Sequence, residues 1–114
     1  MKPTRDDILA EPAGTRLNQW VAEYVTHWQP SGLARDMSGN PFPEPMPDYS
    51  TEIAAAWQAA ETMRERGWFF QLSDWIDSGG WLVQFVCPIA GDVDAEAESV
   101  CVAICRAALL ATTP

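Results

Sequence analysis

Residues 100–111 read VCVAICRAALLA, and this stretch decides the fold because Arg106 is its only charged side chain. A helix at the surface of a domain carries polar residues on its outer face, and this stretch has almost none. We therefore expect a helix that is covered on nearly every side, by the rest of the domain or by a second copy of the chain. The guanidinium needs a partner there, because burying an unpaired charge is very costly.

Two strands are predicted before this helix. Residues 68–72 and 81–87 are rich in aromatic and β-branched side chains, and Asp77-Ser78-Gly79-Gly80 between them predicts a turn. A hairpin of two strands is marginal in water, so the sheet needs a further strand. Either the proline-rich loop or a second subunit could complete it. The last helix is expected to run from residue 95 to residue 112, after a loop at 90–95.

A central helix is predicted over residues 52–66, with Ser50 or Thr51 as its N-cap and Gly67 just past its end. Its apolar side chains recur at three- and four-residue spacing, which indicates one buried stripe. The stripe consists of Ile53, Ala56, Trp57, Ala60 and Met63.

The first half of the chain is less regular. Residues 1–11 are expected to form a loose arm, and residues 12–27 a helix. Residues 29–49 contain five prolines and are predicted to be a long loop, because proline interrupts helices and central strands. The predicted fold class is α/β of the α+β kind, with three helices packed around a small antiparallel sheet. All 114 residues are expected to form one domain.

Charge limits the classes of partner. The net charge is −9, and Lys2 is the only lysine. Direct binding to nucleic acid or to an anionic membrane needs clustered cations, so neither is expected. An acidic surface suits a basic protein instead. The chain has no apolar segment long enough for a membrane span and no signal-peptide core, so we expect a cytoplasmic protein of the host cell.

The sequence offers little for catalysis or for a metal. His27, Cys87, Cys101 and Cys105 are the only candidates for a soft-metal site, but they form no CxxC pair and His27 has no second histidine near it. The same histidine is the only base of its kind for a nucleophile, and no phosphate-binding glycine loop occurs. We therefore predict a protein that is not an enzyme, with no metal and no cofactor.

The order of several motifs resembles a known family. Residues 47–57 read PDYSTEIAAAW, residues 63–68 read MRERGW, and residues 103–109 read AICRAAL, with LNQWVAE upstream at 17–23. Together they are similar to the small phage and prophage proteins of the phage ABA sandwich domain family. The resemblance implies an α/β sandwich of phage or prophage origin and no catalytic residues. The chain departs from the family pattern in its proline-rich loop and in His27, where a small residue is common.

A ligand-binding site is conceivable around Arg106. A guanidinium at a dry interface suits a phosphate or a carboxylate, and Tyr49, Ser50 and Thr51 at a helix N-terminus could complete a pocket for an anionic small molecule. The structural alternative for Arg106 is an ion pair with Glu52, Glu61 or Asp48. For the other three residues the alternative is helix capping.

A partner-binding surface is predicted in and beside the loops, where aromatic, methionine and acidic side chains gather. Its candidate residues are Trp28, Asp36, Phe42, Glu44, Met46, Asp48 and Trp75. The alternative is that the aromatic residues of the loop close the core.

Three functions are consistent with these observations. The first is a phage accessory protein that binds and modulates a host protein, for example by inhibiting an anti-phage defence complex. The second is a protein that sequesters an anionic nucleotide signal through Arg106. The third is a structural or oligomerising phage protein, and a homodimer is favoured over a self-contained monomer.

Overall fold

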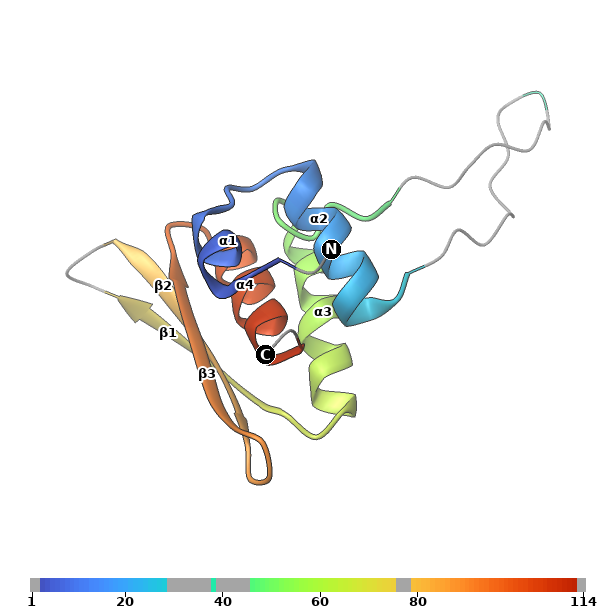
Figure 1. The fold of residues 1–114 in the computed structure, drawn as a ribbon. Helices are drawn as coiled ribbons and strands as arrows, with labels where there is room; N and C mark the ends of the chain where they lie inside the picture. The colour runs from blue at the N-terminus through green and yellow to red at the C-terminus, as the bar shows by residue number, and fades with distance from the viewer. Residues whose placement is uncertain (1–2, 29–37, 39–45, 76–78, 113–114) are drawn as a thin grey trace.

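Helix α4 (Val100–Thr112) lies at the centre of the fold (Figure 1). The sheet packs on one side of it and the other helices surround the rest, so that nine of its 13 residues are buried. The expected covering of this helix is therefore confirmed, and the rest of the same chain provides it. Its first residue is Val100, five residues later than the sequence analysis placed it.

The computed structural model describes residues 3–28, 38, 46–75 and 79–112. The fold class is α+β, as predicted: helices packed with a three-stranded antiparallel sheet. The elements are α1 (Arg5–Ala10), α2 (Thr15–Val21), the π-helical turn η1 (Ala22–Thr26), α3 (Ile53–Glu65), β1 (Phe69–Trp75), β2 (Gly80–Cys87), β3 (Gly91–Ala97) and α4.

The third strand of the sheet is β3, and it corrects the sequence analysis. The strands lie in the order β1-β2-β3, with Val83 of β2 opposite both Leu72 and Ala95. A short turn joins β2 to β3, and Gly91 closes it with a φ of +100°, which glycine adopts without strain. Residues 91–97 were read as loop and helix start because four of the seven are acidic or glycine. Neither the proline-rich segment nor a second subunit is needed to supply this strand.

The N-terminal segment also differs from the expected loose arm. Thr4 and Asp7 form a capping box: the Asp7 carboxylate accepts from the Thr4 backbone N–H (2.9 Å), and the Thr4 hydroxyl accepts from the Asp7 N–H (3.1 Å). Hydrogen bonds to the Asp7 carboxylate, first from the Thr4 backbone N–H and then from the Thr4 side chain, lower the pKa of Asp7. They begin α1, whose Ile8 is fully buried in the core. The helix predicted over 12–27 is present as α2 and η1, beginning at Thr15.

Helix α3 occupies the predicted residues within one position at each end, but two details were wrong. Neither Ser50 nor Thr51 caps it; the N-cap is Glu52, which makes no side-chain capping bond. The buried stripe is made of Ala55, Ala56, Ala59, Ala60 and Met63. Ile53 and Trp57, which were predicted to be buried, are 54% and 45% exposed.

A buried polar cluster ties the segment before α3 to α2. The side-chain oxygen Oδ1 of Asn18 accepts from the Ser50 backbone N–H (2.9 Å) and from the Ser50 hydroxyl (2.7 Å). The Ser50 hydroxyl in turn accepts from the N–H of Gly14 (3.0 Å), and the Asn18 amide donates to Asp48 (3.1 Å). Ser50 is thus a buried tether between two helices that are distant in the sequence.

Replacing Ser50 tests this cluster. We expect Ser50→Ala to lower the free energy of unfolding by about 1–3 kcal/mol, because it leaves the half-buried Gly14 N–H without its acceptor and the buried Asn18 side-chain oxygen without one of its donors. Thr51→Ala is the matched control: its side chain is exposed, so the change should stay within about 0.5 kcal/mol. Urea denaturation of both variants measures the difference, and equal losses would contradict the tether.

Candidate functional site

The clearest local irregularity of the described chain is the end of η1. Its closing residue, His27, has φ 53° and ψ 40°, and it is the one non-glycine residue with a positive φ among those described. The N–H of Trp28 then donates to the Ala22 carbonyl (2.9 Å), which turns the chain sharply out of the helix. π-Helical turns of this kind are frequent at functional sites. Residues other than glycine in the left-handed region also cluster at such sites.

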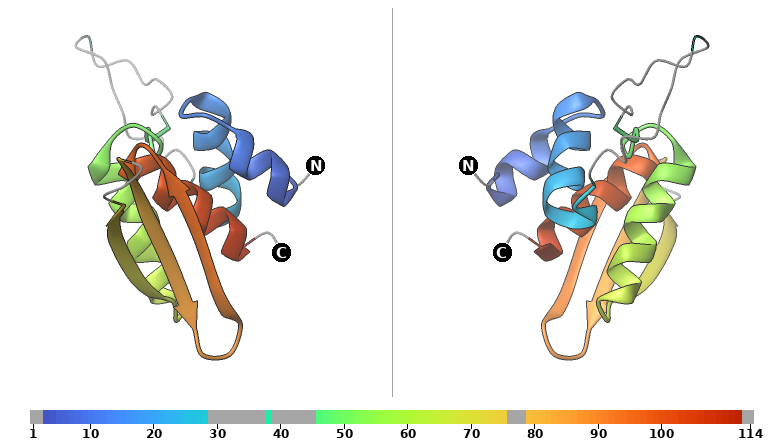
Figure 2. Two further views of the ribbon diagram at one scale, coloured as in Figure 1. Left: turned by 90° about the vertical axis from the view of Figure 1, so that its left-hand side faces the viewer. Right: turned by 90° about the vertical axis from the view of Figure 1, so that its right-hand side faces the viewer.

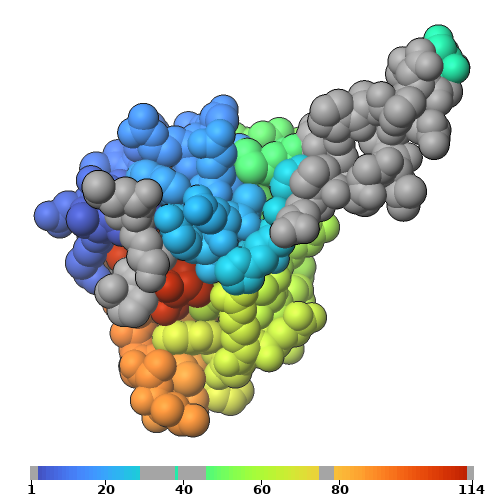
Figure 3. All heavy atoms as spheres, turned by 45° about the vertical axis from the view of Figure 1, so that its right-hand side comes forward, coloured from blue at the N-terminus to red at the C-terminus, as the bar shows by residue number. Residues whose placement is uncertain are grey.

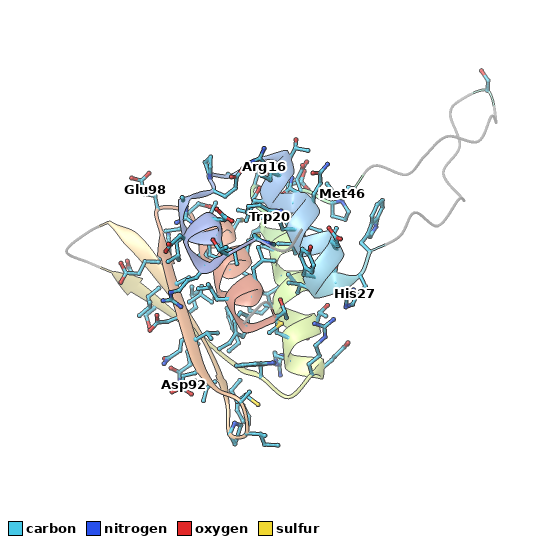
Figure 4. All side chains as sticks on the ribbon, viewed as in Figure 1. Arg16, Trp20, His27, Met46, Asp92 and Glu98 are labelled. Atoms are coloured by element: carbon cyan, nitrogen blue, oxygen red, sulfur yellow. The ribbon has the colours of Figure 1, made fainter. Side chains whose placement is uncertain are left out.

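A groove lies beside this turn and joins two segments that are far apart in the sequence. Both Trp28 and Met46, predicted as partner-binding residues, line it and are half-buried. The complete lining is Gln19, Ala22, Glu23, His27, Trp28 and Met46. In Figure 4, His27 and Met46 lie on the same side of the molecule, and Figure 3 shows η1 at the surface next to the segment that leads into α3.

The turn η1 beside this groove is held in place by two contacts from other elements. The hydroxyl groups of Tyr49 and Thr26 are 2.9 Å apart and share a hydrogen bond. The Arg66 guanidinium, just past the end of α3, donates to the Val25 carbonyl. Because Tyr49 is 1% exposed, its position is fixed by the core, and η1 is anchored at both its side chain and its backbone.

The other predicted partner-binding residues lie elsewhere. The exposed Asp48 uses its carboxylate to bind Asn18 and its carbonyl to accept from the N–H groups of Thr51 (3.2 Å) and Glu52 (2.9 Å). Trp75 ends β1, on the opposite side of the fold from η1 (Figure 1). Asp36, Phe42 and Glu44 lie outside the described residues.

Arg106, the predicted anion-binding residue, is half-buried and donates to two backbone carbonyls. Its Nη1 binds the Glu96 carbonyl (3.1 Å) and its Nη2 the Glu11 carbonyl (3.1 Å), while its buried Nε has no hydrogen-bond partner within the described part of the chain. No ion pair with Glu52, Glu61 or Asp48 is found there. The groove beside Arg106 is lined by Pro12, Ala13, Ala97, Glu98, Ser99 and Val102.

Tyr49, Ser50 and Thr51 do not line the groove beside Arg106. Tyr49 and Ser50 are buried in contacts with Thr26 and Asn18, and Thr51 is exposed. Sequence reasoning did not find Asn18 or the backbone oxygens of Glu11 and Glu96. An asparagine within an apolar helical stripe is the one signal that pointed to the buried cluster, whereas backbone acceptors leave no mark in a sequence.

The thiols have no special arrangement. Cys101 and Cys105 are buried, Cys87 is half-buried, and burial raises the pKa of both Cys101 and Cys105. No cluster of three or more histidine, cysteine or acidic side chains is placed to hold a metal ion among the residues described. None of the helices described there has the length and apolarity needed to cross a membrane.

Comparisons with known proteins give a family and a fold. A family model described as the Phage ABA sandwich domain matches residues 19–109. The chain is also similar to the crystal structure of a phage protein from Bacillus cereus ATCC 14579, with a TM-score of 0.65, 22% sequence identity and 83% of each chain covered. At that identity the likeness establishes the fold alone. No curated protein matches the chain.

The raised thiol pKa values predict which cysteine reacts. A thiol with a raised pKa has less reactive thiolate at a given pH, so iodoacetamide at pH 8 should alkylate Cys87 first. Cys101 and Cys105 should react only when urea unfolds the protein. Peptide mass spectrometry locates the adducts, and alkylation of either buried cysteine as fast as Cys87 would show that α4 is not protected in solution.

Proposed function

The chain belongs to the phage ABA sandwich domain family, and from that premise we propose that it is a non-enzymatic phage accessory protein that binds and modulates a host protein. The observation that carries the proposal is the groove lined by Trp28 and Met46. A protein that inhibits an anti-phage defence complex fits this description best, because a phage gains from disabling such a target.

The chemistry of the groove supports protein binding. Tryptophan is enriched among the residues that dominate binding energies, and methionine adapts its shape to a partner surface. Gln19 and Glu23 supply polar groups around this apolar pair, as the rim of a protein interface does.

The anchoring of η1 also supports recognition. The Tyr49–Thr26 and Arg66–Val25 contacts hold the turn before any partner arrives. A surface that is already in its bound conformation loses less conformational entropy on association, so its affinity is higher for the same contacts. The strained His27 belongs to this same turn, and strain of about 1–3 kcal/mol is commonly kept at functional sites.

The net charge points to a basic partner. With a net charge of −9, the protein attracts a positively charged surface over distances of about a Debye length, roughly 8–10 Å at physiological salt. Such steering raises the association rate more than it raises the affinity. A host protein with a basic binding face, such as one that handles nucleic acid, is the class of target that this charge favours.

Truncating the groove tests the proposal. Tagged wild-type protein and the variants Trp28→Ala and Met46→Ala are expressed in the bacterial host, and the co-purified host proteins are quantified by mass spectrometry. We expect the co-purified amount of one host protein to fall about tenfold or more in each variant, as it does when a hot-spot residue is truncated.

The matched control is Ile89→Ala, because Ile89 is 97% exposed in the turn between β2 and β3 and lines no groove described above. That variant should retain the partner at the wild-type level. A partner that is kept by the Trp28 and Met46 variants, or lost equally from the Ile89 variant, would contradict binding through this groove.

A second function, sequestration of an anionic small molecule, is favoured by the buried Nε of Arg106. This donor faces no acceptor in the described part of the chain, and a phosphate oxygen would satisfy it. Glu98 lies in the same lining and works against an anion. The two Nη atoms already hold backbone carbonyls, so the alternative is a purely structural guanidinium.

Two substitutions separate these roles. Arg106→Met removes both donors to carbonyls and should lower the free energy of unfolding by about 2–4 kcal/mol, whereas Arg106→Lys keeps the charge and should cost less. If the protein sequesters a nucleotide, titration calorimetry should detect binding to the wild type and no binding to an Arg106→Lys variant that is still folded. If no nucleotide binds and only stability changes, Arg106 is structural.

A further inference from the structure

The two edges of the sheet differ in a way that the proposed function does not use. In β1, Asp74 is the only charged residue, and its seven pairs with β2 run without a bulge. Among the described residues no strand pairs with the other side of β1. Proteins normally protect such an edge with lysine, proline or a bulge, and β1 has none of these.

The opposite edge is protected. Asp92, Asp94 and Glu96 alternate along β3, and each pairs with a β2 residue on the face of the sheet that does not carry the buried Val83 and Phe85. Figure 4 shows Asp92 near one end of β3 and Glu98 just past the other. Carboxylates in this spacing repel a further strand unless it is basic. The β3 edge is therefore protected against pairing with another strand, whereas the β1 edge is not.

Helix α3 lies over the place where a strand next to β1 would run. Helix α4 packs on β2 and β3, whereas the main strand contact of α3 is β1. Packed helices are about 8–10 Å apart and paired strands about 4.8 Å apart, so α3 sits about two strand positions from α4. Figure 2 shows α3 running alongside β1.

A groove between α3 and β1 is lined by both aromatic and polar side chains. Trp57 packs edge to face on Phe70, with ring centroids 5.4 Å apart. The preceding Phe69, which pairs with Val86 on the other face of the sheet, is 65% exposed. The groove is lined by Trp57, Ala60, Glu61, Arg64, Phe69, Phe70 and Gln71. Ile53 lies one helical turn before Trp57 and Leu72 two residues after Phe70, and both are also exposed.

We propose that the free edge of β1 under α3 accepts an extended segment of a partner protein as a fourth strand. The segment would form main-chain hydrogen bonds with β1, as in other cases of strand addition. Alternate apolar side chains would enter the groove against Trp57 and Phe70. This surface has no lining residue in common with the groove at Trp28, so it does not depend on that groove being used.

The charge around the edge selects a basic segment. Glu61 lines this groove, Glu65 lines a neighbouring one at the start of β1, and Asp74 lies near the other end of the strand. The Arg64 guanidinium is held by Glu61 at 3.1 Å, and this pair leaves Glu65 and Asp74 to meet a partner. Lysine or arginine at the positions between the apolar residues therefore complements the edge.

A second copy of the chain does not fit the same place. Antiparallel pairing of two β1 strands puts both helix layers on one face of the joined sheet. Each α3 lies over the position of a further strand beside its own β1, so the two α3 helices would occupy the same space. The β3 edge of another copy is acidic and would be repelled by Glu65 and Asp74.

The test uses the whole protein and a peptide of seven residues, the length of β1, with alternating valine and lysine and with both ends capped. Hydrogen exchange should slow about tenfold or more at residues 69–75 when the peptide is present, and stay unchanged at 91–97. The same peptide with glutamate in place of lysine, and one with methylated backbone nitrogens on the pairing edge, should not protect β1.

Variants locate the site on the protein. Trp57→Ala should lower the affinity for the valine–lysine peptide about tenfold. The Trp28→Ala and Ile89→Ala variants should bind the peptide as tightly as the wild type does. Equal binding of the glutamate peptide, protection at 91–97, or no protection at about 1 mM peptide would overturn the proposal. Protection of β1 that grows with protein concentration in the absence of peptide, together with a dimer mass, would identify a second copy and overturn it too. Loss of the host partner from the Trp28 variant alone leaves this inference unaffected, so the two proposals fail separately.

Discussion

The apolar surface of α4 is the constraint on which the rest of the structure depends. A helix of 13 residues with one charged side chain must be removed from water on almost every side. The sheet covers one side through β2 and β3, α3 covers another, and α1, α2 and η1 cover what remains. Arg106 lies at the margin of this covering. Its guanidinium donates to the carbonyls of Glu11, which follows α1, and of Glu96 in β3. Thus the single charged side chain of α4 also joins the N-terminal helices to the sheet.

Elements with strong apolar patterns could be predicted from the sequence, and those without could not. α3, β1, β2 and α4 carry runs of aromatic, branched or alanine residues, and they were found within a few positions. β3 was missed because Asp92, Asp94 and Glu96 outweigh its small buried face, of which Ala95 is the fully covered member. α1 was missed because one buried side chain, Ile8, holds it to the core. Short elements of this kind depend on tertiary contacts, which a local pattern does not contain.

The candidate site was predictable in part for the same reason. Trp28 and Met46 were selected because large apolar side chains beside loops are typical of contact surfaces, and the fold brings them into one groove. The role of Ser50 was not visible, because its partners Asn18 and Gly14 lie more than 30 positions away. A serine before a helix predicts a cap from local spacing alone. Here the long-range hydrogen bonds prevailed, and Glu52 became the N-cap instead.

The alanines of α3 explain why large apolar side chains remain at the surface. Four alanines and Met63 form its buried face, so α3 can approach α4 closely without a bulky residue between them. Ile53 and Trp57 then have no place on this buried face and are 54% and 45% exposed. Polar residues at these two positions would satisfy stability and solubility better. Trp57 packs edge to face on Phe70 of β1 and stays 45% exposed, so an apolar surface lies beside a free strand edge, which is the combination that the proposed strand addition requires.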